Sequence, residues 1–166
     1  MSIKNLFSTE AKQKIKDLAE SIDFNLMAPD LKNIPIHAIP MSTKKVDENG
    51  SIWFLSTKDS NHNSNIKKDK NVHLFYANSG AFEFMNIYGH AYILDDRNII
   101  DDLYQKSDDN WFNGKDDPNL TVIRVEPKDA HYWDTKNGMF VSLLKMGVGV
   151  LTGKKSDLGI EGELKI

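Results

Sequence analysis

Cysteine is absent from this chain of 166 residues. Its absence excludes disulfide bonds, thiolate catalysis and cysteine-ligated metal sites, and it is common among proteins of reducing compartments. Long hydrophobic runs are missing too, because no apolar stretch approaches the roughly 18 residues that a membrane-spanning helix needs. The first residues carry acids among their lysines and contain no apolar signal core. We therefore expect no export signal, no membrane partner and a cytoplasmic location.

The chain also lacks an excess of basic charge. It has 21 lysines and arginines against 24 acids, with a formal net charge of -3, and the two signs are interspersed. Nucleic-acid-binding proteins usually present a basic face, so we expect no nucleic-acid partner. Hydrophobic residues make up 40% of the chain, which is ordinary for a globular protein of this length. The composition predicts a single domain over residues 1–166.

Known catalytic and metal motifs are missing as well. The stretch GVGVLTGKK at 147–155 superficially suggests a phosphate loop, but its glycine spacing is wrong and Lys155 stands where that motif needs Ser or Thr. No two of the five histidines have the short spacing of a zinc site. The acidic pairs at 108–109 and 116–117 are more typical of solvated loops than of calcium sites. We expect no metal and assign no catalytic residue; His37, His62 and Tyr88 are candidates by residue type alone.

Apolar periodicity predicts helices and strands in an order without βαβ alternation. A helix is expected at 8–22, where Ser8 or Thr9 can cap it. The turn sequence ENG at 48–50 predicts a hairpin, and Gly89 is expected to mark a bulge or a close backbone approach within a long strand. Further short helices are expected at 61–69 and 97–105, and further strands at 71–77, 82–96 and 120–135, the last interrupted at Pro127.

About six strands joined by hairpins or short connections indicate a mainly β fold with peripheral α-helices, either an antiparallel barrel or a sandwich. Residues 1–22 provide the N-terminal helix. Residues 136–166 form a C-terminal extension that begins apolar, which suits burial against a partner, and ends polar and rich in glycine.

The stretch between the strands at 52–57 and 71–77 carries more hydrogen-bonding groups than a connection needs. The groups are Ser56, Thr57, Ser60, Asn61, His62, Asn63, Ser64 and Asn65. Hydroxyls, amides and free backbone N–H groups at a helix start are suited to an anion, above all a phosphate monoester. The alternative is a helix cap rich in serine and asparagine with a hydrated surface, and the residues alone leave both interpretations open.

The order of motifs resembles the pyridoxamine 5′-phosphate oxidase-like FMN-binding split barrels, in particular their general stress protein branch. The matching pieces are HAIPMSTKKVDENGSIWFLSTKDSNHNSNIKKDKNVHLFY, FMNIYGHAYILDDRNIIDDLY and WFNGKDDPNLTVIRVEPKDAHYWD. The resemblance implies a six-stranded antiparallel split β-barrel of the FMN-binding type with short flanking helices. It also implies a homodimer that holds FMN at the subunit interface.

The resemblance further implies a set of cofactor-binding positions. Pro40, Met41, Ser42 and Thr43 would run beside the isoalloxazine ring, and Leu55, Ser56 and Thr57 would line the ring edge and the ribityl chain. Ser60, Asn61 and His62 would lie at the phosphate. Trp111, Phe112 and Trp133 would cover the flavin or pack in the interface, with packing preferred for Trp133.

Two departures from the family pattern bear on function. Asn61 and His62 stand where the namesake oxidase has an Arg-Lys pair, and its C-terminal arginine-bearing substrate segment has no match here. We therefore expect no efficient oxidation of pyridoxamine phosphate. The functions left open are a flavin-dependent oxidoreductase with a reduced nicotinamide donor and an unknown substrate, and a non-catalytic FMN-binding or redox-sensing stress protein. A split barrel that binds haem, a deazaflavin or nothing is the third alternative.

Overall fold

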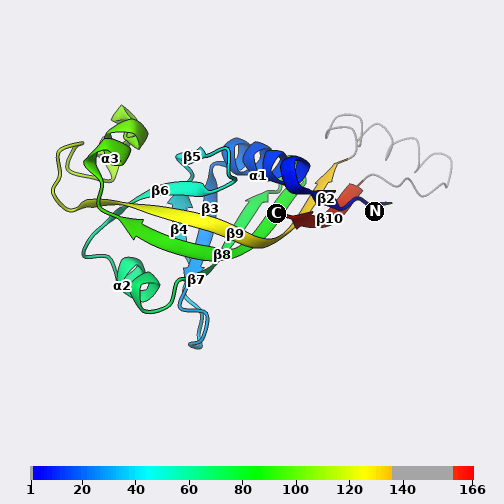
Figure 1. The fold of residues 1–166 in the computed structure, drawn as a ribbon, viewed down its shortest axis with the longest axis horizontal. Coiled ribbons are helices and arrows are strands. Elements are labelled where there is room, and N and C mark those ends of the chain that lie inside the picture. Colours follow the sequence, from blue (N-terminus) through cyan, green and yellow to red (C-terminus); the bar gives the residue numbers. More distant parts are fainter. Residues whose placement is uncertain (1, 136–158) are drawn as a thin grey trace.

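The structure is a computed structural model that describes residues 2–135 and 159–166 (Figure 1). Within these residues the fold is mainly β, with three α-helices at the periphery, as the sequence predicts. The apolar start of the C-terminal extension, which we expected to be suited to burial, lies outside the described residues. None of the described helices has the length and apolarity needed to cross a membrane.

The described strands form one continuous hydrogen-bonded sheet. Their bounds are β1 (Ser2–Ile3), β2 (Leu6–Phe7), β3 (Phe24–Pro29), β4 (Ile39–Ser42), β5 (Lys45–Val46), β6 (Ile52–Thr57), β7 (Asn71–Asn78), β8 (Glu83–Leu94), β9 (Leu120–Thr135) and β10 (Gly159–Lys165). The central order is β10-β9-β8-β7-β3-β4, and β6 pairs with β9 on one side and with β5 on the other. All these pairs are antiparallel, whereas the terminal strands β1 and β2 run parallel to β10.

The sequence prediction of about six strands missed the strands at the two chain ends. β10 contains Gly159 and Gly162, and glycine disfavours strands. A Cβ at Gly162 would lie 2.0 Å from the backbone oxygen of Lys4, so glycine is what lets the N-terminal strand approach β10. The ladder order does not close into a ring, because it ends at β4 on one side and at β5 on the other.

Helix α1 (Ser8–Ile22) covers the inner face of the sheet (Figure 1). Its buried residues Ala11, Ile15, Leu18 and Ala19 recur at helical spacing and join one core with Met27, Leu74, Tyr76 and other inward side chains of the strands. The prediction that Ser8 or Thr9 caps this helix is wrong. The N-cap position falls on Phe7, which has no side-chain acceptor, because the chain enters the helix directly from β2.

The opposite surface of the sheet, here called the outer face, is open and largely apolar, with Ser42, His73, Asn86 and His131 among its apolar side chains. The strand register places these side chains on it: Phe24, Leu26, Pro40, Phe75, Ala77, Phe84 and Trp133. Phe24, Leu26 and Phe75 are 50%, 49% and 43% exposed, respectively. Nothing in the described chain covers them, although an alternating strand normally turns its polar side chains outward.

Gly89 lies at a bulge between β8 and β9, as predicted. The register shifts between Tyr88 and Gly89, and a Cβ at Gly89 would lie 2.6 Å from the backbone oxygen of Glu126. Pro127 faces Gly89 at this shift, so β9 continues through the proline rather than ending there. The extra residue of the bulge is Lys128, directly after Pro127, which cannot donate a ladder hydrogen bond.

Three short elements follow the strands. Helix α2 (Asn61–Lys68) begins after β6, helix α3 (Arg97–Leu103) follows β8, and the 3-10 helix η1 (Lys106–Asn110) follows α3. Ile100 and Leu103 of α3 pack with Leu55 of β6 in a second, smaller core. This packing holds η1 near the ends of β4 and β6, where the candidate site lies.

Candidate functional site

A cavity of about 660 Å³ lies between the end of α1, strand β4, the end of β6, the start of α2 and the segment 105–112. Eight of the ten predicted cofactor-binding residues line it: Pro40, Met41, Ser42, Thr43, Leu55, Ser56, Thr57 and His62. The segments 40–43 and 55–57 are separate in sequence. They meet because Lys44 donates its backbone N–H to the oxygen of Trp53 at 2.8 Å. The fold therefore assembles most of the predicted positions in one place, and their binding of a flavin stays a prediction.

Ser60 and Asn61 do not line the cavity with their side chains. Ser60 is the N-cap of α2: its hydroxyl accepts the backbone N–H of Asn63 at 3.2 Å and donates to the oxygen of Thr57 at 2.9 Å. Asn61 is exposed. Thus the helix-cap interpretation accounts for Ser60. Because the first turn of a helix has no internal acceptors, the backbone N–H groups of Asn61 and His62 are left for a ligand or water.

His62 belongs to a hydrogen-bonded chain at the end of β6. Its Nε2 lies 2.7 Å from the hydroxyl oxygen of Ser56, and that hydroxyl donates to the amide oxygen of Asn63 at 2.9 Å. The amide nitrogen of Asn63 donates to Thr57 O at 2.7 Å and to Thr121 Oγ1 at 3.0 Å. Burial lowers the pKa of the His62 imidazole below its ordinary value, because a desolvated ring disfavours the charged form. At neutral pH the ring is therefore neutral.

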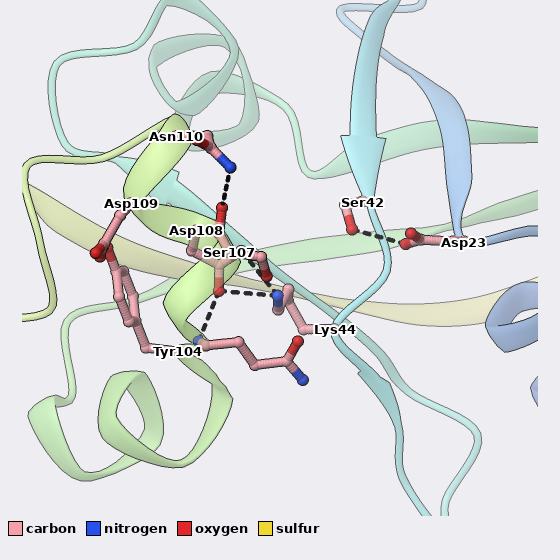
Figure 2. Close-up of polar contacts among 9 residues, drawn as sticks. Asp23, Ser42, Lys44, Tyr104, Ser107, Asp108, Asp109 and Asn110 are labelled. Atoms are coloured by element: carbon pink, nitrogen blue, oxygen red, sulfur yellow. Dashed lines mark hydrogen bonds and ion pairs between the residues drawn. The ribbon is translucent and has the colours of Figure 1, made fainter.

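The wall formed by β4 is held by two further contacts. The Ser42 hydroxyl donates to Asp23 Oδ1 at 2.6 Å (Figure 2), and Thr43 Oγ1 lies 2.9 Å from the hydroxyl of Tyr76. Burial raises the pKa of Tyr76, so its phenol stays protonated. Asp23 ends α1 with a φ of 64°, an uncommon conformation for a residue other than glycine. The sequence analysis missed Asp23, because no spacing links it to the residues of β4.

A buried ion pair attaches η1 to the connection between β4 and β5. Lys44 Nζ lies 2.8 and 2.9 Å from the two carboxylate oxygens of Asp108 (Figure 2), and their side chains are only 7% and 10% exposed. Asp108 also accepts the backbone N–H of Gln105 at 2.7 Å. The expectation that the acidic pair at 108–109 is solvated is therefore wrong for Asp108. A sequence pattern could not reveal its partner, which lies 64 positions earlier.

The segment held by this ion pair supplies the aromatic wall of the cavity. Trp111 and Phe112 both line it, and Trp111 is 75% exposed. Trp133 instead lies on the outer face and donates its indole N–H to Glu161 at 2.9 Å. Among the described residues no cluster of three His, Asp or Glu side chains is placed to hold a metal ion.

Comparison with known proteins agrees with this architecture. Residues 10–157 match the family model described as pyridoxamine 5′-phosphate oxidase like. General stress protein 26 of Bacillus subtilis is 26% identical over 137 residues, which cover 81% of this chain and 96% of that protein. A candidate general stress protein 26 from Jannaschia sp. CCS1 superposes with a TM-score of 0.76 at 19% identity, covering 95% of this chain and 98% of that one.

One structural relative has a stated ligand class. The general stress FMN/FAD binding protein from Xanthomonas citri superposes with a TM-score of 0.65 at 25% identity, and the match covers 76% of this chain and 90% of that one.

We predict that Lys44→Met destabilises the protein by about 3–5 kcal/mol, because it leaves the Asp108 carboxylate buried without a counter-charge. Urea unfolding followed by tryptophan fluorescence at fixed protein concentration measures the change. Adding Asp108→Asn should restore part of the loss, since the amide oxygen can still accept from Gln105.

The matched control is Lys45→Met. Lys45 pairs with Asp102 at 3.0 Å, but the two side chains are 47% and 64% exposed, so its removal should cost at most about 1 kcal/mol. Equal losses for the Lys44 and Lys45 variants would show that the Lys44 ion pair does not hold η1.

Proposed function

Because the chain belongs to the pyridoxamine 5′-phosphate oxidase-like family, we propose that it is an FMN-binding protein of the general stress protein type and acts as a flavin-dependent oxidoreductase. The observation that carries the proposal is the cavity that joins β4, the end of β6 and His62. The flavin-binding description of the Xanthomonas citri relative supports the ligand class. The phosphate-suited end of the cavity favours FMN over riboflavin.

The residues present fit such a ligand. Met41 and Leu55 offer apolar surface for an aromatic ring, and Trp111 and Phe112 lie on the wall formed by the segment 105–112. Thr57 and the free backbone N–H groups of Asn61 and His62 provide donors that suit a ribityl phosphate, whereas the Ser56 hydroxyl donates to Asn63. We propose that Ser60 contributes by capping α2 rather than by touching the phosphate.

FMN, when bound, supplies the electron-transfer chemistry, and the protein supplies binding, orientation and proton control. Of the titratable groups on the cavity wall, Lys44 and Asp108 neutralise each other, and Asp23 accepts from Ser42. Glu20 and His62 are the other titratable groups on this wall among the described residues. We assign none of these groups a catalytic role.

We further propose that β3, β4, β6, β7, β8 and β9 constitute the six-stranded split barrel of this family. The hydrogen bond from Lys44 N to Trp53 O supports it, because it brings the chain that leaves β4 beside β6 at the open side of the ladder. β5 forms only a two-residue ladder with β6 at this place.

A homodimer with FMN at its interface is the assembly that we propose. The open apolar outer face supports a second copy as its occupant, because exposed aromatic and aliphatic patches of this kind mark protein interfaces. Phe24 and Pro40 belong to both the outer face and the cavity lining. A copy seated on this face would therefore close one side of the cavity.

The charges of the cavity disfavour a second phosphorylated molecule. Lys44 is the lysine on its wall, and Asp108 neutralises it, while Glu20 and Asp23 add negative charge. Among the described residues that line the cavity, an anionic substrate would meet no unpaired cation. This supports the expectation that pyridoxamine phosphate is not the substrate.

We predict that FMN stabilises the protein and that riboflavin does so much less. At about a hundredfold excess over its dissociation constant a ligand adds about 2.7 kcal/mol, which a thermal melt detects as a clear rise in Tm. The absorbance spectrum of the purified protein is the companion measurement. A Tm that does not change when FMN is added would show that the flavin does not bind in this cavity.

We predict that Phe75→Asp yields monomers and weakens FMN binding, since a carboxylate on the outer face cannot be buried against a second copy without a partner. Light scattering after size-exclusion chromatography measures the mass. Ile34→Asp is the control, because Ile34 is 93% exposed in the loop between β3 and β4 and belongs to no strand of the outer face. An unchanged dimer in the Phe75 variant would move the interface elsewhere.

We predict that NADH or NADPH bleaches the bound flavin and that an added acceptor restores its colour over many cycles, whereas pyridoxamine phosphate is oxidised negligibly. Stopped-flow absorbance measures the reduction and reoxidation of the flavin, and a product assay measures the oxidation of pyridoxamine phosphate. Flavin that stays oxidised with both nicotinamides would instead favour the non-catalytic alternative. Appreciable turnover of pyridoxamine phosphate would contradict the charge argument.

A further inference from the structure

The orientation of the Asn63 amide is determined by its neighbours. Asn63 is fully buried, and one end of its amide lies 2.7 Å from the backbone oxygen of Thr57. A carbonyl oxygen can only accept, so the NH₂ group must face Thr57. The same NH₂ group donates to Thr121 Oγ1 at 3.0 Å, and the amide oxygen therefore faces the hydroxyl of Ser56 at 2.9 Å.

This orientation determines how Ser56 meets His62. A hydroxyl has one hydrogen to donate, and the amide oxygen of Asn63 takes the one on Ser56. The contact of 2.7 Å between Ser56 Oγ and His62 Nε2 then requires the ring to donate. Neutral His62 therefore carries its hydrogen on Nε2, and its Nδ1 keeps a lone pair that no hydrogen bond among the described residues uses.

The charged groups around the cavity do not alter the neutral state of His62. They are Glu20 and Asp23 near the end of α1, Lys44 after β4 and Asp108 on η1. Lys44 and Asp108 pair with each other, Asp23 accepts from Ser42, and Glu20 accepts the backbone N–H of Val46 at 3.3 Å. No ion pair to His62 occurs in the described part of the chain, and β6 presents only the neutral Ser56 and Thr57.

We propose that Asn63 is a positioning residue that presents His62 Nδ1 to the ligand, and that binding of a phosphate monoester there takes up one proton on Nδ1. The inference deepens the proposed function and rests on it. A lone pair on Nδ1 repels a phosphate oxygen, whereas a protonated Nδ1 donates a charge-assisted hydrogen bond. Nε2 cannot serve instead, because Ser56 already accepts its hydrogen.

The sign of the pH dependence follows. His62 is neutral in the ligand-free protein and protonated in the complex, so a nearby phosphate dianion raises its pKa on binding. FMN affinity then falls as pH rises, by up to tenfold per pH unit between the free and the bound pKa of His62. A fixed lysine at this position would show no such fall.

Calorimetry at about pH 7.5, in two buffers of different ionisation enthalpy, counts the protons taken up per FMN. The phosphate of FMN is already mostly a dianion there. We expect an uptake approaching one proton for the wild-type protein. His62→Gln and His62→Lys should take up almost none, the first with weaker affinity and the second with affinity retained. Uptake that is absent from the wild type, or unchanged in His62→Gln, overturns the proton-coupled part.

Nitrogen-15 NMR of the ligand-free protein tests the positioning part without FMN. We expect neutral His62 as one tautomer with its hydrogen on Nε2. Thr121→Val should leave this signature intact, because Thr57 O still orients the amide. Asn63→Leu should give a mixture of tautomers, because it frees the Ser56 hydroxyl to donate.

A wild-type ring with its hydrogen on Nδ1 overturns the positioning part, even if the Asn63 variant does not fold. Failure of FMN to bind at any pH overturns the proposed function and the ligand step together, and the tautomer result then stands alone.

Discussion

The pairing capacity of one long strand organises the molecule. A strand has two edges, and β9 uses one of them along its length for β8. Its other edge pairs with β6 at residues 120–125 and with β10 at 131–135. The cavity end and the chain termini are therefore held at opposite ends of the same strand (Figure 1). The bulge at Gly89 lets this ladder continue past Pro127, so the two ends share one sheet.

The hydrogen-bonding groups of the polar stretch after β6 fall into two sets. The side chains of Ser60 and Asn63 are used within the protein, to cap α2 and to fix the end of β6. The backbone N–H groups of Asn61 and His62 and one ring nitrogen of His62 are bonded to no other group within residues 2–135 and 159–166. The observed helix cap and the proposed anion site are therefore compatible, because capping orders the turn that presents these N–H groups.

Local patterns made much of the fold predictable. Apolar spacing located α1, the turn sequence at 48–50 located the hairpin of β5 and β6, and Gly89 marked the bulge. The family resemblance gave eight of the cavity positions, in the segments 40–43 and 55–57 and at His62. The features that the sequence did not reveal depend on contacts between distant segments. β10 forms despite its glycines because Gly162 admits the N-terminal strand. Phe7 is the N-cap of α1 because β2 leads directly into the helix.

The ion pair between Asp108 and Lys44 is another contact between distant segments that the sequence pattern did not reveal. A buried ion pair is weak support for stability, because the desolvation of two charges offsets their attraction. The Lys44–Asp108 pair is better understood as fixing position: it sets η1, and with it Trp111 and Phe112, against the cavity. The same contact removes the charge of the lysine on the cavity wall. The proposed selectivity against anionic substrates is therefore linked to the position of η1, because any substitution that frees Lys44 also releases the aromatic wall.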